Sequence, residues 1–481
     1  MKLLFVTSEA APYSKTGGLA DVSSGLPAAL AALGVQVKVV TPLYRTVAEG
    51  DHPLATLKST FQVNFRGHAL HGRVSVHRLQ PDLSYYFIGR DEFFDRSFLY
   101  GTPQGDYFDN ADRFIFFSRA VLAACRLLRF RPDIVHCHDW QAALIPALLK
   151  HSPEGHPFWQ KTRSVLTIHN LAYQGVFSQE YMPVSGLPPD LFTMEGLEFY
   201  GQMNFLKAGI VFADRITTVS KTYANEICTP EFGYGLDGVL RQHKPTLTGI
   251  LNGVDYASWD PAVDPHIARH YGRGDLSGKL LCKQELRQIY GLTGLPGDPL
   301  IGMVARLVEQ KGLDIILEAV DGILKTGADM VILGSGEDRY HKELSALARR
   351  HKGRLGVRIG FDPALAHKIE AGADIFLMPS RYEPCGLNQM YSLKYGTIPL
   401  VRATGGLEDT VREFDPKTGR GNGFKFKTYS APALISSVRR ATALYKKKDM
   451  WASLVKNAMR ADFSWDTAAR KYLSLYERVL G

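Results

Sequence analysis

The sequence is poor in long apolar runs and in paired cysteines. No apolar stretch reaches the roughly 20 residues that would span a bilayer. The first segment holds one lysine and a few apolar residues before Ser8 and Glu9, which is too short for a signal peptide. The five cysteines are scattered without a CxxC pair, so we expect reduced thiols rather than a disulfide framework. These absences predict a cytoplasmic protein that has no membrane partner.

The chain also lacks the composition of a disordered or a nucleic-acid-binding protein. With 45% hydrophobic and 22% charged residues it resembles an ordinary globular protein, and its 481 residues suggest two or three domains. The net charge is +9, but the basic residues are spread out, and the densest run, Lys446-Lys447-Lys448, is short. We therefore expect no nucleic-acid partner, and an anionic small substrate accounts for part of the excess charge.

The amino-terminal segment has the βαβ pattern of a parallel sheet. The pattern predicts a strand at residues 3–7, a loop at 8–18, a helix at 19–33 that ends before Gly34, and a second strand at 35–40.

The same plan begins again at residue 300. Here the pattern predicts a strand at residues 300–305, a loop at 306–312, a helix at 313–325 and a strand at 330–333. Both loops carry a lysine and a glycine at the turn from strand to helix. Further strand-like runs, which alternate with helical segments, lie at residues 134–138, 164–169, 215–219, 357–360, 375–379 and 398–401.

This alternation predicts an α/β fold of two doubly wound, Rossmann-like domains that face an interdomain cleft. We place the first domain at residues 1–250 and the second at 251–459, with a linker near 248–252. Residues 460–481 include an amphipathic helix, which we expect to pack back on the first domain.

The first strand-to-helix turn, Lys15 to Asp21, is a candidate anion site. Gly17 and Gly18 bring backbone N–H groups and the positive end of a helix dipole to one spot. Lys15 adds a mobile cation, and Asp21 adds an acceptor for hydroxyl groups. The alternative is a plain tight turn before a helix.

Two loops of the second domain offer complementary groups. Arg306 and Lys311 bracket the loop after its first strand, and a planar fork beside a point cation suits a diphosphate. Glu383 follows the strand at 375–379, and Gly386 and Leu387 offer backbone N–H groups. A carboxylate there fixes sugar hydroxyls or acts as a nucleophile.

The turn after the strand at 398–401 repeats this device. Thr404, Gly405 and Gly406 open a helix, and Glu408 in its first turn is placed to accept hydrogen bonds from ribose hydroxyls. Read alone, each of these turns is simply a helix start.

The run His136-Cys137-His138-Asp139 raises the question of a metal. On a strand His136 and His138 face one side and Cys137 the other, so the four cannot converge on one ion, and we expect no metal. Asp139 at the strand end is suited to sugar hydroxyls or the acceptor. His169 ends a neighbouring strand and is a candidate hydrogen-bond donor to substrate, with a satisfied core histidine as the alternative.

Several motifs occur in order from one end of the chain to the other. They are Lys15-Thr16-Gly17-Gly18-Leu19-Ala20-Asp21-Val22, His138-Asp139-Trp140, Thr167-Ile168-His169-Asn170, Leu251-Asn252-Gly253-Val254-Asp255, Arg306 with Lys311-Gly312, Pro379-Ser380-Arg381-Tyr382-Glu383-Pro384-Cys385-Gly386-Leu387 and Thr404-Gly405-Gly406-Leu407. Together they resemble bacterial glycogen synthase and plant starch synthase, glycosyltransferases of the GT-B fold.

The resemblance implies a retaining glucosyltransferase that moves glucose from ADP-glucose to the non-reducing 4-hydroxyl of an α-1,4-glucan such as glycogen and releases ADP. It implies no cofactor, neither a metal nor pyridoxal phosphate. The donor ADP-glucose would be held by Lys15, Gly17, Gly18, Asn252, Arg306, Lys311, Cys385, Gly386, Leu387, Thr404, Gly405, Gly406 and Glu408. The acceptor side would include Asp21 and Asp139. The catalytic group would comprise His169, Glu383, Arg306, Lys311 and Asp139.

Chemically, two cations and the helix amino ends would stabilise the negative charge that develops on the departing ADP. Retention without an obvious nucleophile favours a front-face route, and a covalent intermediate on Glu383 is the alternative. The alternative functions are a UDP-glucose-dependent glucosyltransferase of the same fold, a glucan phosphorylase, and a non-catalytic glucan-binding relative.

Overall fold

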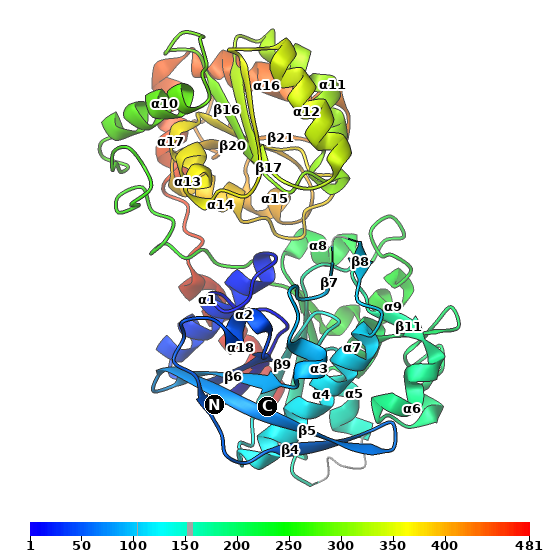
Figure 1. Ribbon diagram of the computed structural model, residues 1–481. Coiled ribbons are helices and arrows are strands. Elements are labelled where there is room, and N and C mark those ends of the chain that lie inside the picture. Colours follow the sequence, from blue (N-terminus) through cyan, green and yellow to red (C-terminus); the bar gives the residue numbers. More distant parts are fainter. Residues whose placement is uncertain (103, 152–156) are drawn as a thin grey trace. The chain divides into compact units, whose positions relative to one another are not determined.

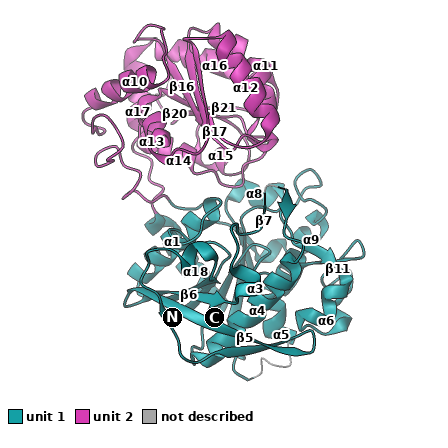
Figure 2. Cartoon of the chain, in the orientation of Figure 1, with its two compact units in different colours: residues 1–253, 465–481 teal, residues 254–464 magenta. Residues whose placement is uncertain are grey.

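The computed structural model describes residues 1–102, 104–151 and 157–481, and Figure 1 shows their elements. The chain forms two compact units (Figure 2). Unit 1 comprises residues 1–253 and 465–481, and unit 2 comprises residues 254–464. The chain therefore crosses between units after Gly253 and after Ser464.

Unit 1 is built on a sheet whose strands run parallel over most of its width. In spatial order the parallel strands are β6 (Leu83–Gly89), β2 (Gln36–Pro42), β1 (Lys2–Val6), β9 (Ile134–His138), β10 (Arg163–Ile168), β14 (Arg215–Thr218) and β15 (Leu247–Gly249). The chain winds outward from β1 in one direction and then restarts at β9 in the other. The topological switch point of unit 1 thus lies between β1 and β9.

An antiparallel extension continues this sheet beyond β6, and the sequence patterns had not indicated it. β5 (His68–Gln80) pairs antiparallel with β6, and β3 (Ala55–Thr56) and β4 (Phe61–Phe65) pair antiparallel with β5. In β4 every second residue, beginning with Phe61, is buried. This alternation is the sequence signal for a strand with one face on the core.

Helices cover the sheet of unit 1, and its last helix comes from the other end of the chain. α18 (Trp465–Leu480) packs against α1 (Gly18–Ala32), as Figure 1 shows. A Cβ atom on Gly25 would lie 2.0 Å from Trp465 Nε1, so only glycine lets the two helices approach this closely. The remaining elements of unit 1 are α2 (Arg45–Ala48), α3 (Asp91–Phe94), β7 (Gly101–Thr102), β8 (Gly105–Asp106), α4 (Asn110–Leu127), α5 (Ile145–His151), β11 (Val176–Ser178), α6 (Met182–Ser185), β12 (Glu198–Phe199), β13 (Gln202–Asn204), α7 (Phe205–Phe212), α8 (Lys221–Glu226) and α9 (Asp237–Gln242).

Unit 2 repeats the strand order in a fully parallel sheet. The order is β18 (Leu355–Ile359), β17 (Asp329–Gly334), β16 (Leu300–Val304), β19 (Ile375–Met378), β20 (Ile398–Arg402) and β21 (Phe424–Phe426). The switch point of unit 2 lies between β16 and β19.

Both faces of this sheet are buried, each in its own core. Ile301 and Ile375 pack into the core formed with α11 (Leu313–Leu324), α16 (Ala431–Tyr445) and α17 (Lys448–Ala458). Their strand neighbours Leu300 and Phe376 belong to the opposite core, with α10 (Ser277–Ile289) and α13 (Pro363–Gly372). This alternation explains why the strands of unit 2 read as continuous apolar runs. The other helices of unit 2 are α12 (Asp338–Arg350), α14 (Asn388–Lys394) and α15 (Gly405–Thr410).

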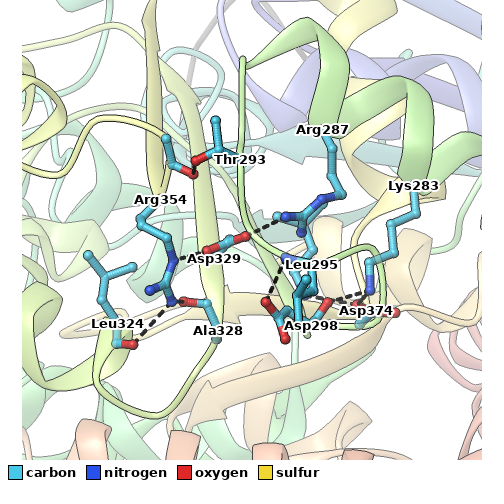
Figure 3. Close-up of polar contacts among 12 residues, drawn as sticks. Lys283, Arg287, Thr293, Leu295, Asp298, Leu324, Ala328, Asp329, Arg354 and Asp374 are labelled. Atoms are coloured by element: carbon cyan, nitrogen blue, oxygen red, sulfur yellow. Dashed lines mark hydrogen bonds and ion pairs between the residues drawn. The ribbon is translucent and has the colours of Figure 1, made fainter.

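Buried charges fasten α10 to the amino-terminal edge of the unit 2 sheet (Figure 3). Asp329, which is fully buried at the start of β17, accepts from Arg287 Nη2 at 2.7 Å and from Arg354. Lys283 Nζ lies 2.7 Å from Asp374 Oδ2, directly before β19. Because ligands of such sheets bind at the opposite, carboxyl edge, this network is structural. None of the helices in the described ranges is both long and apolar enough to cross a membrane.

Candidate active site

The candidate catalytic residues of unit 2 lie in the two loops that flank its switch point. One loop follows β16 and contains Arg306 and Lys311, and the other follows β19 and contains Glu383. The loops are joined by backbone and side-chain hydrogen bonds: Arg381 N donates to Gln310 O at 2.9 Å, and Gln310 Nε2 donates to Tyr382 O at 3.3 Å. The topology therefore brings together residues that are more than 70 positions apart in the sequence.

Lys311 and Glu383 form a largely buried ion pair in this place. Lys311 Nζ lies 2.6 Å from Glu383 Oε2, and the side chains are 19% and 7% exposed. Ser380 Oγ donates to the same carboxylate oxygen at 3.0 Å. Gly312 makes the approach possible, because its φ of 76° is left-handed and a Cβ atom there would lie 2.3 Å from Pro379 O.

Arg306 is exposed at the end of β16 and, within the described parts of the chain, its guanidinium has neither a hydrogen bond nor an ion pair. Its backbone is fixed by the adjacent loop: Leu307 N donates to Ser335 O at 2.8 Å. A planar cation with a fixed backbone and an uncommitted side chain is suited to an incoming anion.

The turn at Thr404 to Glu408 packs directly against the loop that carries Glu383, a contact that the sequence did not predict. Gly406 N donates to Glu383 O at 3.0 Å, and Cβ atoms on Gly405 and Gly406 would lie 2.0 Å from the carbonyl oxygens of Glu383 and Cys385. The two glycines thus allow this turn to lie directly against the loop that carries Glu383. Glu408 Oε1 accepts from Lys425 Nζ at 2.8 Å.

The remaining donor-side candidates of unit 2 complete this loop. Cys385 is buried, Gly386 has a left-handed φ of 70°, and Leu387 caps α14. Asn252, in unit 1 beside the crossing, is 7% exposed, and its Oδ1 has no hydrogen-bond partner among the described residues.

In unit 1, the turn after β1 is organised by a carboxylate. Glu9, 4% exposed, accepts from Thr16 N at 2.6 Å and from Gly17 N at 3.2 Å. The N–H group of Gly17 is therefore occupied, whereas the sequence predicted a bare N–H group there. Lys15 Nζ lies 2.6 Å from Asp21 Oδ1, so the exposed Lys15 and the half-buried Asp21, assigned to donor and acceptor, contact each other.

Asp139 and His169 meet at the carboxyl ends of β9 and β10. His169 N donates to Asp139 Oδ1 at 2.7 Å, and Asp139 has a left-handed φ of 55°. Burial raises the pKa of the Asp139 carboxyl to about 7, against the lowering effect of backbone hydrogen bonds from His169 and Asn170. An aspartate that titrates near neutrality at a strand end is typical of a functional site.

His136, His138 and His169 lie on the neighbouring strands β9 and β10 or at their ends, and His138 contacts His169. His138 Nδ1 lies 2.9 Å from His169 Nε2, and burial lowers the pKa of His169 to about 3, so the ring is neutral. His136 uses both ring nitrogens, with Tyr476 OH at 2.8 Å and Thr167 Oγ1 at 2.6 Å. Within the described ranges, no group of three or more His, Cys, Asp or Glu side chains is arranged to hold a metal ion.

Comparison with known proteins decides the family. Residues 2–242 match the model of the starch synthase catalytic domain, and residues 289–458 match that of glycosyl transferases group 1. Glycogen synthase from Koribacter versatilis is 48% identical over 481 residues, covering 100% of this chain and 98% of the relative. The chain belongs to the glycogen synthase and starch synthase family. Glycogen synthase from an Anaeromyxobacter species is 50% identical over 480 residues, covering 100% of this chain and 99% of the relative.

A solved structure agrees with this family at the level of the fold. The catalytic domain of starch synthase IV from Arabidopsis thaliana, described as bound to ADP and acarbose, matches with a TM-score of 0.91 and 35% identity, covering 99% of each chain. The predicted α/β fold with two Rossmann-like domains of GT-B type is confirmed. The predicted class of enzyme, a hexosyltransferase of the glycogen synthase family, is confirmed as well.

Several residues that build the site were missed in the sequence. Glu9 was treated as part of a loop, although an acidic residue three positions after the end of a buried strand is itself a signal. His138 was considered for a metal rather than as the partner of His169, and Ser380 was not given a role. The contacts of His138 and Ser380 depend on strand register and loop packing.

Proposed function

We propose that this enzyme transfers glucose from ADP-glucose to the non-reducing 4-hydroxyl of an α-1,4-glucan such as glycogen, with retention, and releases ADP. The family supports transfer to a glucan, and the relative described as bound to ADP and acarbose supports an adenine nucleotide and an oligosaccharide as ligands. We propose that no metal or pyridoxal phosphate takes part. A cytoplasmic location stays a prediction from the sequence.

The observation that carries the proposal is the Lys311–Glu383 pair at the switch point, beside the uncommitted Arg306. Lys311 and Arg306 place two positive charges where a diphosphate leaving group would accumulate negative charge, and preorganised cations stabilise such charge without a metal. Glu383 offers a carboxylate to the hydroxyls of the glucosyl unit. Cys385, Gly386 and Leu387 would complete the donor pocket from the same loop.

The state of Glu383 favours the front-face route over a covalent intermediate. Its Oε2 already accepts from Lys311 Nζ at 2.6 Å and Ser380 Oγ at 3.0 Å. A carboxylate oxygen held by a cation and a hydroxyl is a weakened nucleophile and a well-oriented hydrogen-bond acceptor. In our proposal the departing phosphate therefore removes the proton from the acceptor 4-hydroxyl, and the new bond forms on the face that ADP leaves.

In unit 1 we propose that His169 donates a hydrogen bond to the transferred glucose. Among the described residues none offers a partner to His138 Nε2, which is fully buried. An orphaned acceptor nitrogen costs less than an orphaned N–H, so His138 carries its proton on Nδ1 and donates it to His169 Nε2. The proton of the neutral His169 then lies on Nδ1, where it is free to be donated to a sugar oxygen.

The other unit 1 residues complete the assignment. We propose that Lys15, with the start of α1 at Gly17 and Gly18, contacts the donor phosphates after exchanging its contact with Asp21 for the anion. Asp139 and Asp21 would face the acceptor. Asn252, Thr404, Gly405, Gly406 and Glu408 stay predictions for the donor side, Gly405 and Gly406 through loop packing.

The proposal is tested by incubating the enzyme with glycogen and ADP-glucose or UDP-glucose labelled in the glucose. We expect label in the polymer from ADP-glucose at a rate at least tenfold above that from UDP-glucose. Subsequent β-amylase digestion should release the label as maltose, because this enzyme removes maltose from the non-reducing ends of α-1,4 chains. Label that enters only from UDP-glucose, or that resists β-amylase, would contradict the proposal.

A further inference from the structure

Three exposed tyrosines of unit 1 lie on neighbouring loops and have no role in the site described so far. Tyr173 is 56% exposed, Tyr200 is 82% exposed and Tyr234 is 42% exposed. Tyr173 follows β10, Tyr200 is at the tip of the β12–β13 hairpin, and Tyr234 precedes α9. Large aromatic side chains at such exposure require a reason, because burial is their usual source of stabilisation.

Two of these tyrosines also hold an unfavourable backbone conformation. Tyr200 has a φ of 51° and Tyr234 a φ of 47°, and each precedes a glycine that is also left-handed, Gly201 at 76° and Gly235 at 81°. Phe199 pairs with Gln202, so Tyr200 and Gly201 form a two-residue turn with φ positive at both positions, a type I′ turn. Asn-Gly is the preferred sequence for this turn, and a bulky residue is an outlier. The backbone conformation of Tyr200 and Tyr234 therefore does not account for a tyrosine at either position.

The three loops are fastened to one another. Gln174, next to Tyr173, donates from Nε2 to Tyr234 O at 3.0 Å and accepts from Asn204 Nδ2 at 2.7 Å. A Cβ atom on Gly235 would lie 2.9 Å from Phe199 Cζ, so the turn after Tyr234 packs against the hairpin that carries Tyr200. The loops of Tyr173, Tyr200 and Tyr234 are therefore joined to one another, and we call these three joined loops the platform.

This platform is continuous with the candidate site of unit 1. Tyr173 N donates to Asn170 O at 3.2 Å, and Asn170 directly follows His169. The loop of Tyr173 is therefore hydrogen-bonded to the residue that directly follows His169.

We propose that Tyr173, Tyr200 and Tyr234 bind the acceptor glucan chain. A pyranose ring has apolar C–H faces and a rim of hydroxyls, and tyrosine matches both with an apolar ring and a polar hydroxyl. The polymer is uncharged, which suits a surface built from aromatic rather than charged side chains. This inference rests on the proposed function, since it assumes that the substrate of the site is a glucan.

The test uses substitutions that remove the ring and relieve the backbone. Tyr200→Asn and Tyr234→Asn place the favoured residue in each left-handed turn, and a merely structural role of the two rings predicts unchanged substrate binding. We expect the double variant to melt no lower than the wild type, to migrate freely in glycogen-containing native gels that retard the wild type, and to show a KM for glycogen raised about tenfold. Its KM for ADP-glucose should stay unchanged.

Arg66→Asn is the matched control, because Arg66 has a φ of 51° in the two-residue turn between β4 and β5 and precedes Gly67 at 78°. It should leave retardation by glycogen unchanged. If glycogen retards the double tyrosine variant as strongly as the wild type, the inference is wrong, even if ADP-glucose proves to be the donor. Conversely, retardation that depends on the tyrosines in an enzyme that does not use ADP-glucose would refute the proposed donor and leave the glucan surface standing.

Discussion

Replacing Asp139 by asparagine should stabilise the protein at alkaline pH and leave it little changed at acid pH. Asn tolerates the left-handed φ of 55° and keeps an oxygen for the hydrogen bond from His169 N. The variant therefore removes the charge and little else. The same substitution should lower kcat/KM, since a carboxyl group is lost from the proposed acceptor side.

The sign follows from the raised pKa. Burial raises the pKa of Asp139 from its usual 3.8 to about 7, so the folded state holds this proton more tightly than the unfolded state. The stabilisation from the protonated form is fully present below pH 3.8 and is lost as the pH rises through 7. At about 1.4 kcal/mol per unit of pKa, ionising Asp139 costs the fold at most about 4 kcal/mol.

The assay is thermal unfolding of both proteins between pH 5 and pH 8.5. About two units of the pKa shift of Asp139 lie between pH 5 and pH 7. The free energy of unfolding of Asp139→Asn, relative to the wild type, should therefore rise by about 2.7 kcal/mol from pH 5 to pH 8.5, or roughly 5 °C in Tm. Asp139→Ala is the control: it strains the backbone and removes the acceptor for His169 N, and should melt below the wild type throughout. An advantage of Asp139→Asn that stays constant or shrinks as the pH rises would refute the reasoning.

Three further predictions concern other parts of the molecule. His138→Leu leaves His169 Nε2 without its partner and should lower kcat about 10- to 100-fold, whereas His138→Asn keeps a donor near the Nδ1 position and should retain most activity; steady-state kinetics that do not separate the two variants would contradict the assigned proton. Asp329→Ala leaves the buried Arg287 without its partner and should destabilise unit 2 by about 3–5 kcal/mol in urea unfolding, with the activity per folded molecule unchanged; a loss of kcat in fully folded protein would contradict a purely structural role. Lys15→Ala should raise the KM for ADP-glucose far more than the KM for glycogen, and unchanged saturation by the donor would remove Lys15 from the donor site.

The sequence predicted the parallel core and the ends of its strands well, because apolar strands and turn residues are local signals. Residues 134–138 and 375–379 were expected as strands and are observed as Ile134–His138 and Ile375–Met378. It also placed Arg306, Lys311 and Glu383 at strand ends, but the contact between Lys311 and Glu383 depends on β16 and β19 being neighbours, which is a property of the topology.

What the sequence could not predict are contacts that depend on register and long-range packing. His138 meets His169 because Thr167 of β10 lies opposite His138 of β9. Glu9 occupies the N–H groups of the first turn because the chain folds back on itself there. Gly405 was interpreted as part of a ligand turn, and the close approach of the Glu383 carbonyl that requires it became visible only in three dimensions.

The central claim is that Glu383, held by Lys311, orients the glucosyl unit of the donor, and kinetics of Glu383→Ala test it most directly. The measurement is transfer of label from ADP-glucose to glycogen by the purified variant, together with its far-UV circular dichroism. We predict a loss of kcat by at least two orders of magnitude, about 2.7 kcal/mol of transition-state stabilisation, with an unchanged dichroism spectrum. Transfer within a few-fold of the wild-type rate by a folded variant would contradict the claim.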